Sequence, residues 1–216
     1  ALTEAAAAAG LRPEPDYVRE VAVQKQKWND LIKSEVIVQH DGDNINQGHL
    51  VTILNDMMQS GDALVAAAGT IPTDLTALFD SSNGRTLFLE FGYSCMGFDI
   101  PAAIGVRMAR SGGEIFVLMG DGNYQMHPME LVTAIQEKTK ITIVLVVNGG
   151  FQSIHGHQKA LVGHSLGNEF RIRDAKTNRL DDGEFINIDY AKHAESVGLK
   201  AWNATDETEI RNALKA

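Results

Sequence analysis

Asp121 and Asn148 each follow an apolar run of the length of a buried strand, and each lies next to glycine. Asp121 follows residues 115–119 within a Gly-Asp-Gly motif, and Asn148 follows residues 141–147 and precedes two glycines. A carboxylate, a side-chain amide and a nearby backbone carbonyl are oxygen donors of the kind that Mg2+ prefers, often alongside phosphate oxygens. These residue types therefore suit the binding of a diphosphate through a divalent cation.

The two motifs are expected to meet because the segment between them has the pattern strand, helix, strand. Residues 114–148 form one right-handed crossover unit in this interpretation, and its parallel strands end at the same edge of the sheet. Ligands of open α/β sheets bind at that edge. Two alternatives stay open here. One is a dinucleotide site, although the third glycine of that fingerprint is absent, and the other is a pair of plain turns.

Strands alternate with helices from residue 46 onward, which predicts an α/β fold with a mostly parallel sheet. Strands are expected at residues 63–68, 86–91, 114–119, 141–147 and 199–202. Helices are expected at residues 50–58, 73–79, 101–110, 128–138, 189–197 and 205–214. Residues 151–187 show weak periodicity, so we expect a long functional loop region there.

Residues 1–45 have few strand signals and are expected to be a helical lead-in or inter-domain linker that packs on the main body. Within and just after it, helices are predicted at residues 4–10 and 16–33, and a polar loop at residues 39–46. Residues 46–216 form the second expected domain, which binds the diphosphate and the metal. Because the chain begins with Ala1 rather than Met, we expect a fragment of a longer enzyme.

Composition excludes several classes of function. The chain of 216 residues has a net charge of −9 and no basic cluster, so nucleic acid is not expected as a partner. Its one cysteine excludes a disulfide framework and predicts a cytoplasmic protein with a small buried thiol at Cys95. No apolar stretch reaches the length of a membrane span, so no membrane partner is expected.

The residues around Asp121 and Asn148 resemble the signature of thiamine diphosphate (ThDP) enzymes, which is Gly-Asp-Gly, a spacer and Asn-Asn. Val147 stands where the first Asn usually lies, a departure at a position that is not a ligand. The resemblance implies a three-layer, doubly wound, mostly parallel sheet with helices on both faces. It also implies that Asp121, Asn148 and the Gly150 carbonyl hold Mg2+, and that the main chain of Gly122 and Asn123 contacts the diphosphate of ThDP.

Two further segments resemble the same family. Gly69 and Thr70 resemble a strand end that contacts the diphosphate, with the Thr70 hydroxyl as a donor. The segment Ser94, Cys95 and Met96 resembles the cradle of the aminopyrimidine ring. The resemblance implies that the Ser94 carbonyl accepts from the 4′-amino group and that Met96 wedges the cofactor into a bent shape.

Within the family, residues 89–98, 130–137, 150–154 and 170–174 resemble hydrolases that open a cyclic 1,2-dione in myo-inositol catabolism. The implied substrate is a small polyol-derived dione, and the implied assembly is a homo-oligomer. In it, a pyrimidine-binding domain of a neighbouring subunit supplies the activating glutamate. No catalytic residue of this chain matches that glutamate, so the chain alone is expected to be inactive. Alternatives are an acetolactate synthase-like carboligase and a non-catalytic module with the same fold.

Polar residues that follow Gly150 are candidates for contact with the substrate, chiefly Gln152 and His155. A histidine near a reacting carbonyl could act as an acid or a base. Three histidines lie close together in this region, His155, His157 and His164, so a solvated loop and a metal site also stay open as interpretations.

Overall fold

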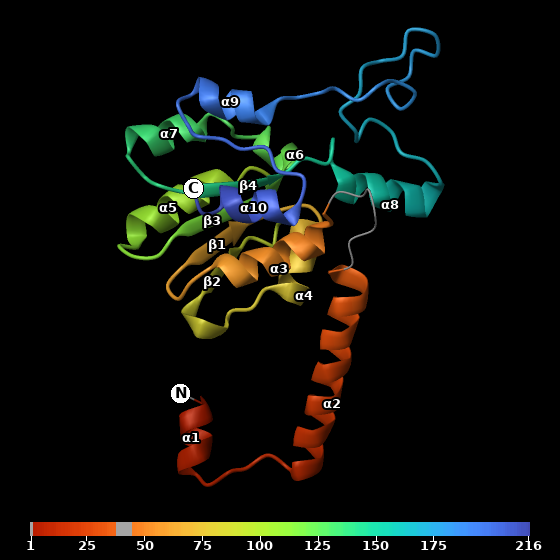
Figure 1. Ribbon diagram of the computed structural model, residues 1–216. Helices are drawn as coiled ribbons and strands as arrows, with labels where there is room; N and C mark the ends of the chain where they lie inside the picture. Colours follow the sequence, from red (N-terminus) through yellow and green to blue (C-terminus); the bar gives the residue numbers. More distant parts are fainter. Residues whose placement is uncertain (1, 38–44) are drawn as a thin grey trace.

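A computed structural model describes residues 2–37 and 45–216, and its centre is a parallel sheet of four strands in the order β2-β1-β3-β4 (Figure 1). The strands are β1 (Ala63–Ala66), β2 (Thr86–Leu89), β3 (Ile115–Gly120) and β4 (Thr142–Val146). Strands β1 and β3 are central and almost completely buried, whereas β2 and β4 are at the edges and only partly buried. Both edge strands are therefore less buried than their apolar sequences suggest.

Alternate residues of the central strands point to two separate cores, because successive side chains of a strand face opposite sides of the sheet. Leu64, Phe116 and Leu118 pack under helices α3 (Gln47–Met57), α4 (Ile71–Leu78) and α10 (Glu207–Ala213). Val65, Val117 and Met119 pack on the other face, under α5 (Asp99–Ala109), α7 (Glu130–Gln136) and α9 (Tyr190–Ser196). The predicted three-layer α/β fold is confirmed, with a sheet that is wholly parallel in the described residues.

Two elements differ from the sequence expectation. Residues 199–202 form no strand, and Trp202 is 51% exposed, because this segment leaves the core after Leu199 instead of pairing with a sheet edge. The expected loop of residues 151–187 begins with helix α8 (Gln152–Val162), which ends at Gly163 in the left-handed conformation. A short helix, α6 (Asp121–Tyr124), also follows β3 directly.

The lead-in forms helices α1 (Leu2–Ala8) and α2 (Pro15–Leu31), followed by a π-helical turn at Ile32–Val36. None of these elements contains a buried residue, and α2 extends away from the sheet (Figure 1). Helices α1 and α2 therefore do not pack on the main body as expected. The described segment contacts it at Val36, whose carbonyl oxygen accepts from the Asn46 side chain at 2.7 Å. The domain boundary itself stays a prediction, and most of the predicted loop at residues 39–46 lies outside the described residues.

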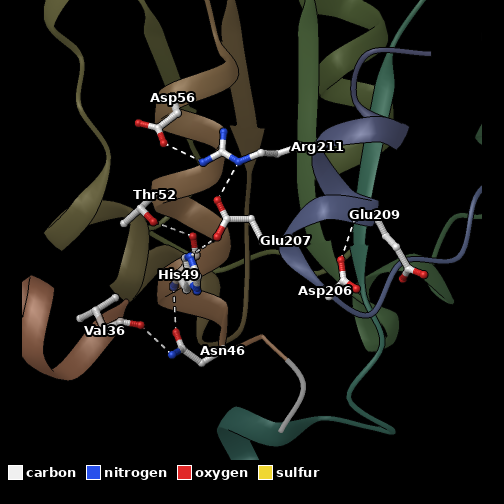
Figure 2. A network of polar contacts seen from close by, with 9 residues as sticks. All are labelled: Val36, Asn46, His49, Thr52, Asp56, Asp206, Glu207, Glu209 and Arg211. Atoms are coloured by element: carbon white, nitrogen blue, oxygen red, sulfur yellow. Dashed lines mark hydrogen bonds and ion pairs between the residues drawn. The ribbon is translucent and has the colours of Figure 1, made fainter. Parts of the chain in front are cut away.

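A polar network attaches the C-terminal helix to α3 (Figure 2). The Arg211 guanidinium donates to Asp56 at 2.8 Å and to Glu207 at 2.7 Å, and Glu207 lies 3.2 Å from Nε2 of the buried His49. Asn46 caps α3 by accepting from the His49 backbone N–H at 2.8 Å. The last helix of the chain is thereby fixed to the helix that precedes β1.

Among residues 2–37 and 45–216, no helix combines the length and the apolar character that crossing a lipid bilayer requires.

Replacing Gly113 by alanine is expected to lower the free energy of unfolding by about 2 kcal/mol or more. Gly113 has a φ of +72°, and a Cβ atom there would lie 2.0 Å from the carbonyl oxygen of Gly61. Gly112→Ala is the matched control, because no heavy atom lies within 4 Å of a Cβ at Gly112. Urea unfolding measures both variants, and equal stability of the two would contradict the assignment of strain to Gly113.

Candidate functional site

Strands β3 and β4 bring Asp121 and Asn148 to the same edge of the sheet. Their register pairs Met119 with Leu145 and Gly120 with Val146, so the two strands end side by side. The Asp121 side chain is completely buried, and its Oδ2 atom accepts from the backbone N–H of Gly149 at 2.7 Å and of Asn148 at 3.2 Å. Asp121 and Asn148 therefore lie next to each other, as the strand-helix-strand pattern predicts.

Oxygen atoms converge beside this pair. One terminal atom of the Asn148 side-chain amide lies 3.1 Å from Asp121 Oδ1 and 3.0 Å from the Gly150 carbonyl oxygen. If this atom is the amide nitrogen, it donates to both oxygens. If it is the amide oxygen, three oxygens lie close together, and a bound cation would offset their repulsion. Neighbouring ligands of an octahedral Mg2+ lie about 2.9–3.0 Å apart, given metal–oxygen distances of about 2.0–2.1 Å. The spacing of the donor atoms therefore fits Mg2+.

Gly150 is held in place by the segment that follows α8. It forms an antiparallel bridge with Glu169, and a Cβ atom at Gly150 would lie 2.3 Å from the Asn168 carbonyl oxygen. The neighbouring Phe151 N–H donates to the same carbonyl at 2.7 Å. The close approach requires glycine, and it fixes the direction in which the Gly150 carbonyl points.

A cavity of about 320 Å³ opens at this edge of the sheet. It is lined by most residues that the sequence singles out for cofactor binding, namely Gly69, Thr70, Ser94, Met96, Gly122, Asn123, Asn148 and Gly150, and by the substrate candidate Gln152. Asp121 lies behind the wall, fully buried. Cys95 and His155 are not among the lining residues.

Cys95 is exposed, which corrects the expectation of a small buried thiol. The cysteine lies in the turn between β2 and α5, where residues 91–96 are all exposed. Its neighbours Ser94 and Met96 do line the cavity. The structure therefore brings two of the three residues of the predicted aminopyrimidine cradle into the cavity wall.

Gln47 is a lining residue that the sequence analysis missed. Its side chain accepts from the Thr70 hydroxyl at 3.1 Å and donates to Asp74 at 2.6 Å. The hydroxyl that was expected to contact a diphosphate is thus held by an amide from the start of α3. No motif surrounds Gln47, so its contact with Thr70 across 23 residues has no signal in the sequence.

Gln152 and His155 take different places on α8. Gln152 lines the cavity and donates to the Asn148 carbonyl oxygen at 3.0 Å. His155 faces Glu169 instead, with Nδ1 3.9 Å from its carboxylate. Within the described part of the chain, no three His, Cys, Asp or Glu side chains form a group that could hold a metal ion. The alternative of a metal site on the histidines therefore has no support in the structure.

A second buried acid, Asp99, lies behind the cavity wall. Its Oδ2 atom accepts from the Asn123 side-chain amide at 3.2 Å, and the same amide donates to the Ala68 carbonyl oxygen at 3.1 Å. Two acceptors hold both amide hydrogens of Asn123, so this side chain is fixed in the wall. Asp99 Oδ1 has no hydrogen-bond partner, and burial raises the pKa of Asp99 to about 6.

Comparison with known proteins now identifies the family. Residues 67–216 match the family model described as thiamine pyrophosphate enzyme, C-terminal TPP binding domain. The chain belongs to the thiamine pyrophosphate enzymes. Its fold agrees, because a thiamine diphosphate-dependent 4-hydroxybenzoylformate decarboxylase of Rhodococcus jostii RHA1 superposes with a TM-score of 0.69 at 20% identity. The superposition covers 82% of this chain and 31% of the decarboxylase.

Relatives within the thiamine pyrophosphate enzymes carry a more specific name. The 3D-(3,5/4)-trihydroxycyclohexane-1,2-dione hydrolase 1 of a Bacillus cereus strain is 36% identical over 173 residues. The hydrolase of the same substrate from Bacillus thuringiensis (strain Al Hakam) matches equally well over 173 residues. Each alignment covers 80% of this chain but 27% of the relative, so the chain spans about a quarter of the length of these hydrolases.

The electrostatics of Asp121 suit a thiamine pyrophosphate domain. Burial raises the pKa of the Asp121 carboxyl above its ordinary value, and hydrogen bonds from four backbone N–H groups, that of Gly149 first, oppose this rise. A divalent cation between the carboxylate and a diphosphate would favour the charged form and replace repulsion by attraction. The buried acid is thus placed where a cation would stabilise it.

Replacing Asp99 by asparagine is expected to raise the free energy of unfolding above pH 6. Because the pKa of Asp99 is raised by burial from 3.8 to about 6, the folded state binds the proton more tightly than the unfolded state. The stability that tighter proton binding contributes is fully present below the pKa of Asp99 in the unfolded state. It is lost as the pH rises through the folded-state pKa of about 6. Asp99→Asn should therefore gain about 3 kcal/mol at pH 8 and little at pH 4, measured by urea unfolding.

Asp189→Asn serves as the control of opposite sign. The pKa of Asp189 is lowered, chiefly by a hydrogen bond from Lys192. The stability that the Asp189 carboxylate contributes is present above its pKa in the unfolded state and is lost as the pH falls through its lowered pKa in the folded state. The Asp189→Asn variant should therefore be less stable than the parent at neutral pH. If the Asp99→Asn variant is less stable than the parent at pH 8, the buried carboxylate of Asp99 does not destabilise the folded state.

Proposed function

We propose that the chain binds thiamine diphosphate together with Mg2+, and that it is the C-terminal part of a hydrolase. The substrate would be 3D-(3,5/4)-trihydroxycyclohexane-1,2-dione, whose ring opens by hydrolysis of a C–C bond. The observation that carries the cofactor assignment is the convergence of Asp121, Asn148 and the Gly150 carbonyl beside a cavity in a thiamine pyrophosphate domain. The hydrolase assignment rests on the relatives of that name.

The residues of this chain would hold the cofactor and orient it. Asp121, Asn148 and Gly150 would ligate Mg2+, while Thr70 and the main chain of Gly122 would contact the diphosphate. When bound, thiamine diphosphate supplies an electron sink for the carbanion that C–C cleavage leaves behind. Gln152, fixed by the Asn148 carbonyl, is the residue of α8 that we place beside the substrate.

A partner domain is part of the proposal. An apolar surface lies next to the cavity, formed by exposed side chains in the turn after β2 and around residue 126: Phe91, Tyr93, Met96, Phe98, Met126 and Met129. The two segments are adjacent, because Gly97 lies against Met126 and His127. Large exposed apolar patches mark interaction sites. We assign this surface to a pyrimidine-binding domain of a neighbouring subunit, in a homo-oligomer.

Asp121→Asn is expected to weaken Mg2+-dependent binding of thiamine diphosphate about 100-fold, because the variant loses the charged ligand while keeping the shape of the side chain. Isothermal titration of the chain with the cofactor in Mg2+ or in EDTA measures the effect. Asp16→Asn, an exposed acid on α2 that pairs with Arg19, is the control with the same charge change. If Asp121→Asn and the parent bind thiamine diphosphate with equal affinity in Mg2+, the assignment of Asp121 as a metal ligand is wrong.

The full-length enzyme that contains this domain is expected to open the cyclic trihydroxy-dione and to leave pyruvate unreacted. The chain alone should show no turnover, because the glutamate that activates the cofactor is expected on the pyrimidine-binding domain. Mass spectrometry of the products with either substrate measures this. Formation of acetolactate from pyruvate would favour the carboligase, and ring opening by the chain alone would contradict the need for a partner.

A further inference from the structure

The turn between β2 and α5 carries two residues of the cavity wall, Ser94 and Met96. Residues 91–96 are all exposed, so burial of side chains contributes little to holding the turn in place. Ser94 also has a φ of +53°, in the left-handed region that residues other than glycine rarely adopt. A conformation of this kind persists only when surrounding contacts determine it. The contacts of the turn therefore decide the shape of this side of the cavity.

Glu90 provides such contacts from the end of β2. Its Oε1 atom accepts from the Tyr93 backbone N–H at 3.0 Å, and its Oε2 atom accepts from the Cys95 backbone N–H at 2.6 Å. The two donors lie on either side of Ser94. The carboxylate thus binds the backbone on both sides of Ser94, the residue with the unusual backbone conformation.

Glu90 is itself tied to the central part of the sheet. Its backbone N–H donates to the Ala66 carbonyl oxygen of β1 at 3.1 Å, in continuation of the β1–β2 ladder. Two residues after Ala66, Ala68 lines the cavity. The position of the turn is therefore set relative to the strand end on which Gly69 and Thr70 lie.

Both hydrogen bonds require a carboxylate. A carboxylate accepts at two oxygens, whereas the amide of glutamine accepts at one oxygen and presents an NH2 group at the other position. In a glutamine variant, one backbone N–H would face a donor and lose its bond. The hydrogen bonds from Cys95 and then Tyr93 also lower the pKa of Glu90, so the group stays a carboxylate at neutral pH.

We propose that Glu90 is a positioning residue for cofactor binding: it holds Ser94 and Met96 in the cavity wall, on the side that receives the ring system of the cofactor. This inference rests on the proposed function, because the ring system is that of thiamine diphosphate. The diphosphate side of the cavity, built by Asp121, Asn148 and Gly150, does not depend on Glu90.

The test compares two probes on the same chain by isothermal titration: thiamine diphosphate with Mg2+, and inorganic pyrophosphate with Mg2+. Glu90→Gln should weaken binding of thiamine diphosphate about tenfold and Glu90→Ala more, while both variants bind pyrophosphate as the parent does. Glu114→Gln is the charge-matched control, because Glu114 lies just before β3, at the end of the strands opposite the cavity, and pairs with Lys140 at 2.9 Å. Amide hydrogen exchange at Tyr93 and Cys95 should become faster in Glu90→Ala.

The outcomes distinguish a failure of the proposed function from a failure of the role of Glu90. A parent chain that binds neither probe would overturn the proposed function. A parent that binds thiamine diphosphate, with Glu90 variants of equal affinity, would overturn only the role of Glu90. Equal weakening of both probes would show a general structural defect, and unchanged exchange at Tyr93 and Cys95 would show that Glu90 does not hold the turn. Each of these last two results would also overturn the inference.

Discussion

The buried carboxylate of Asp121 is the interaction on which the site depends. It lies at the end of β3 and accepts from the backbone N–H groups of Asn148 and Gly149, just beyond β4. A buried carboxylate is costly unless it is paired or hydrogen-bonded. Its bonds to the segment after β4 therefore stabilise it and also fix the two strand ends relative to each other. The convergence of oxygens beside Asn148 and Gly150 follows from that geometry.

The other walls of the cavity come from loops that a rigid sheet positions, which is the usual arrangement for functional residues. Each loop has a polar contact that determines its place. Gln47 holds Thr70 after β1, Glu90 holds the turn after β2, and Asp99 holds Asn123 after β3. The cavity is thus built from a few hydrogen-bonded side chains around a fixed edge, and the apolar cores lie behind it on both faces of the sheet.

Much of the fold could be predicted, because apolar strands that alternate with amphipathic helices leave few arrangements open. The four strands lie at the predicted places, with ends that differ by a few residues. The errors have physical causes. The segment 199–202 is apolar enough for a strand but finds no partner in the sheet, and Cys95 is exposed because it lies in a turn outside both cores. Helix α8 was missed because its glycine and histidines weaken the apolar periodicity.

What the sequence by itself determined is that Asp121 and Asn148 share one edge of the sheet. Two parallel strands joined by a right-handed crossover end on the same side, whatever their side chains are. Only the tertiary structure decided which other side chains reach that edge. Gln47 and Thr70 are 23 residues apart and Asp99 and Asn123 are 24 residues apart, so their contacts depend on how separate loops pack. The direction of His155 towards Glu169 was decided in the same way, because the facing segment sets which side of α8 is covered.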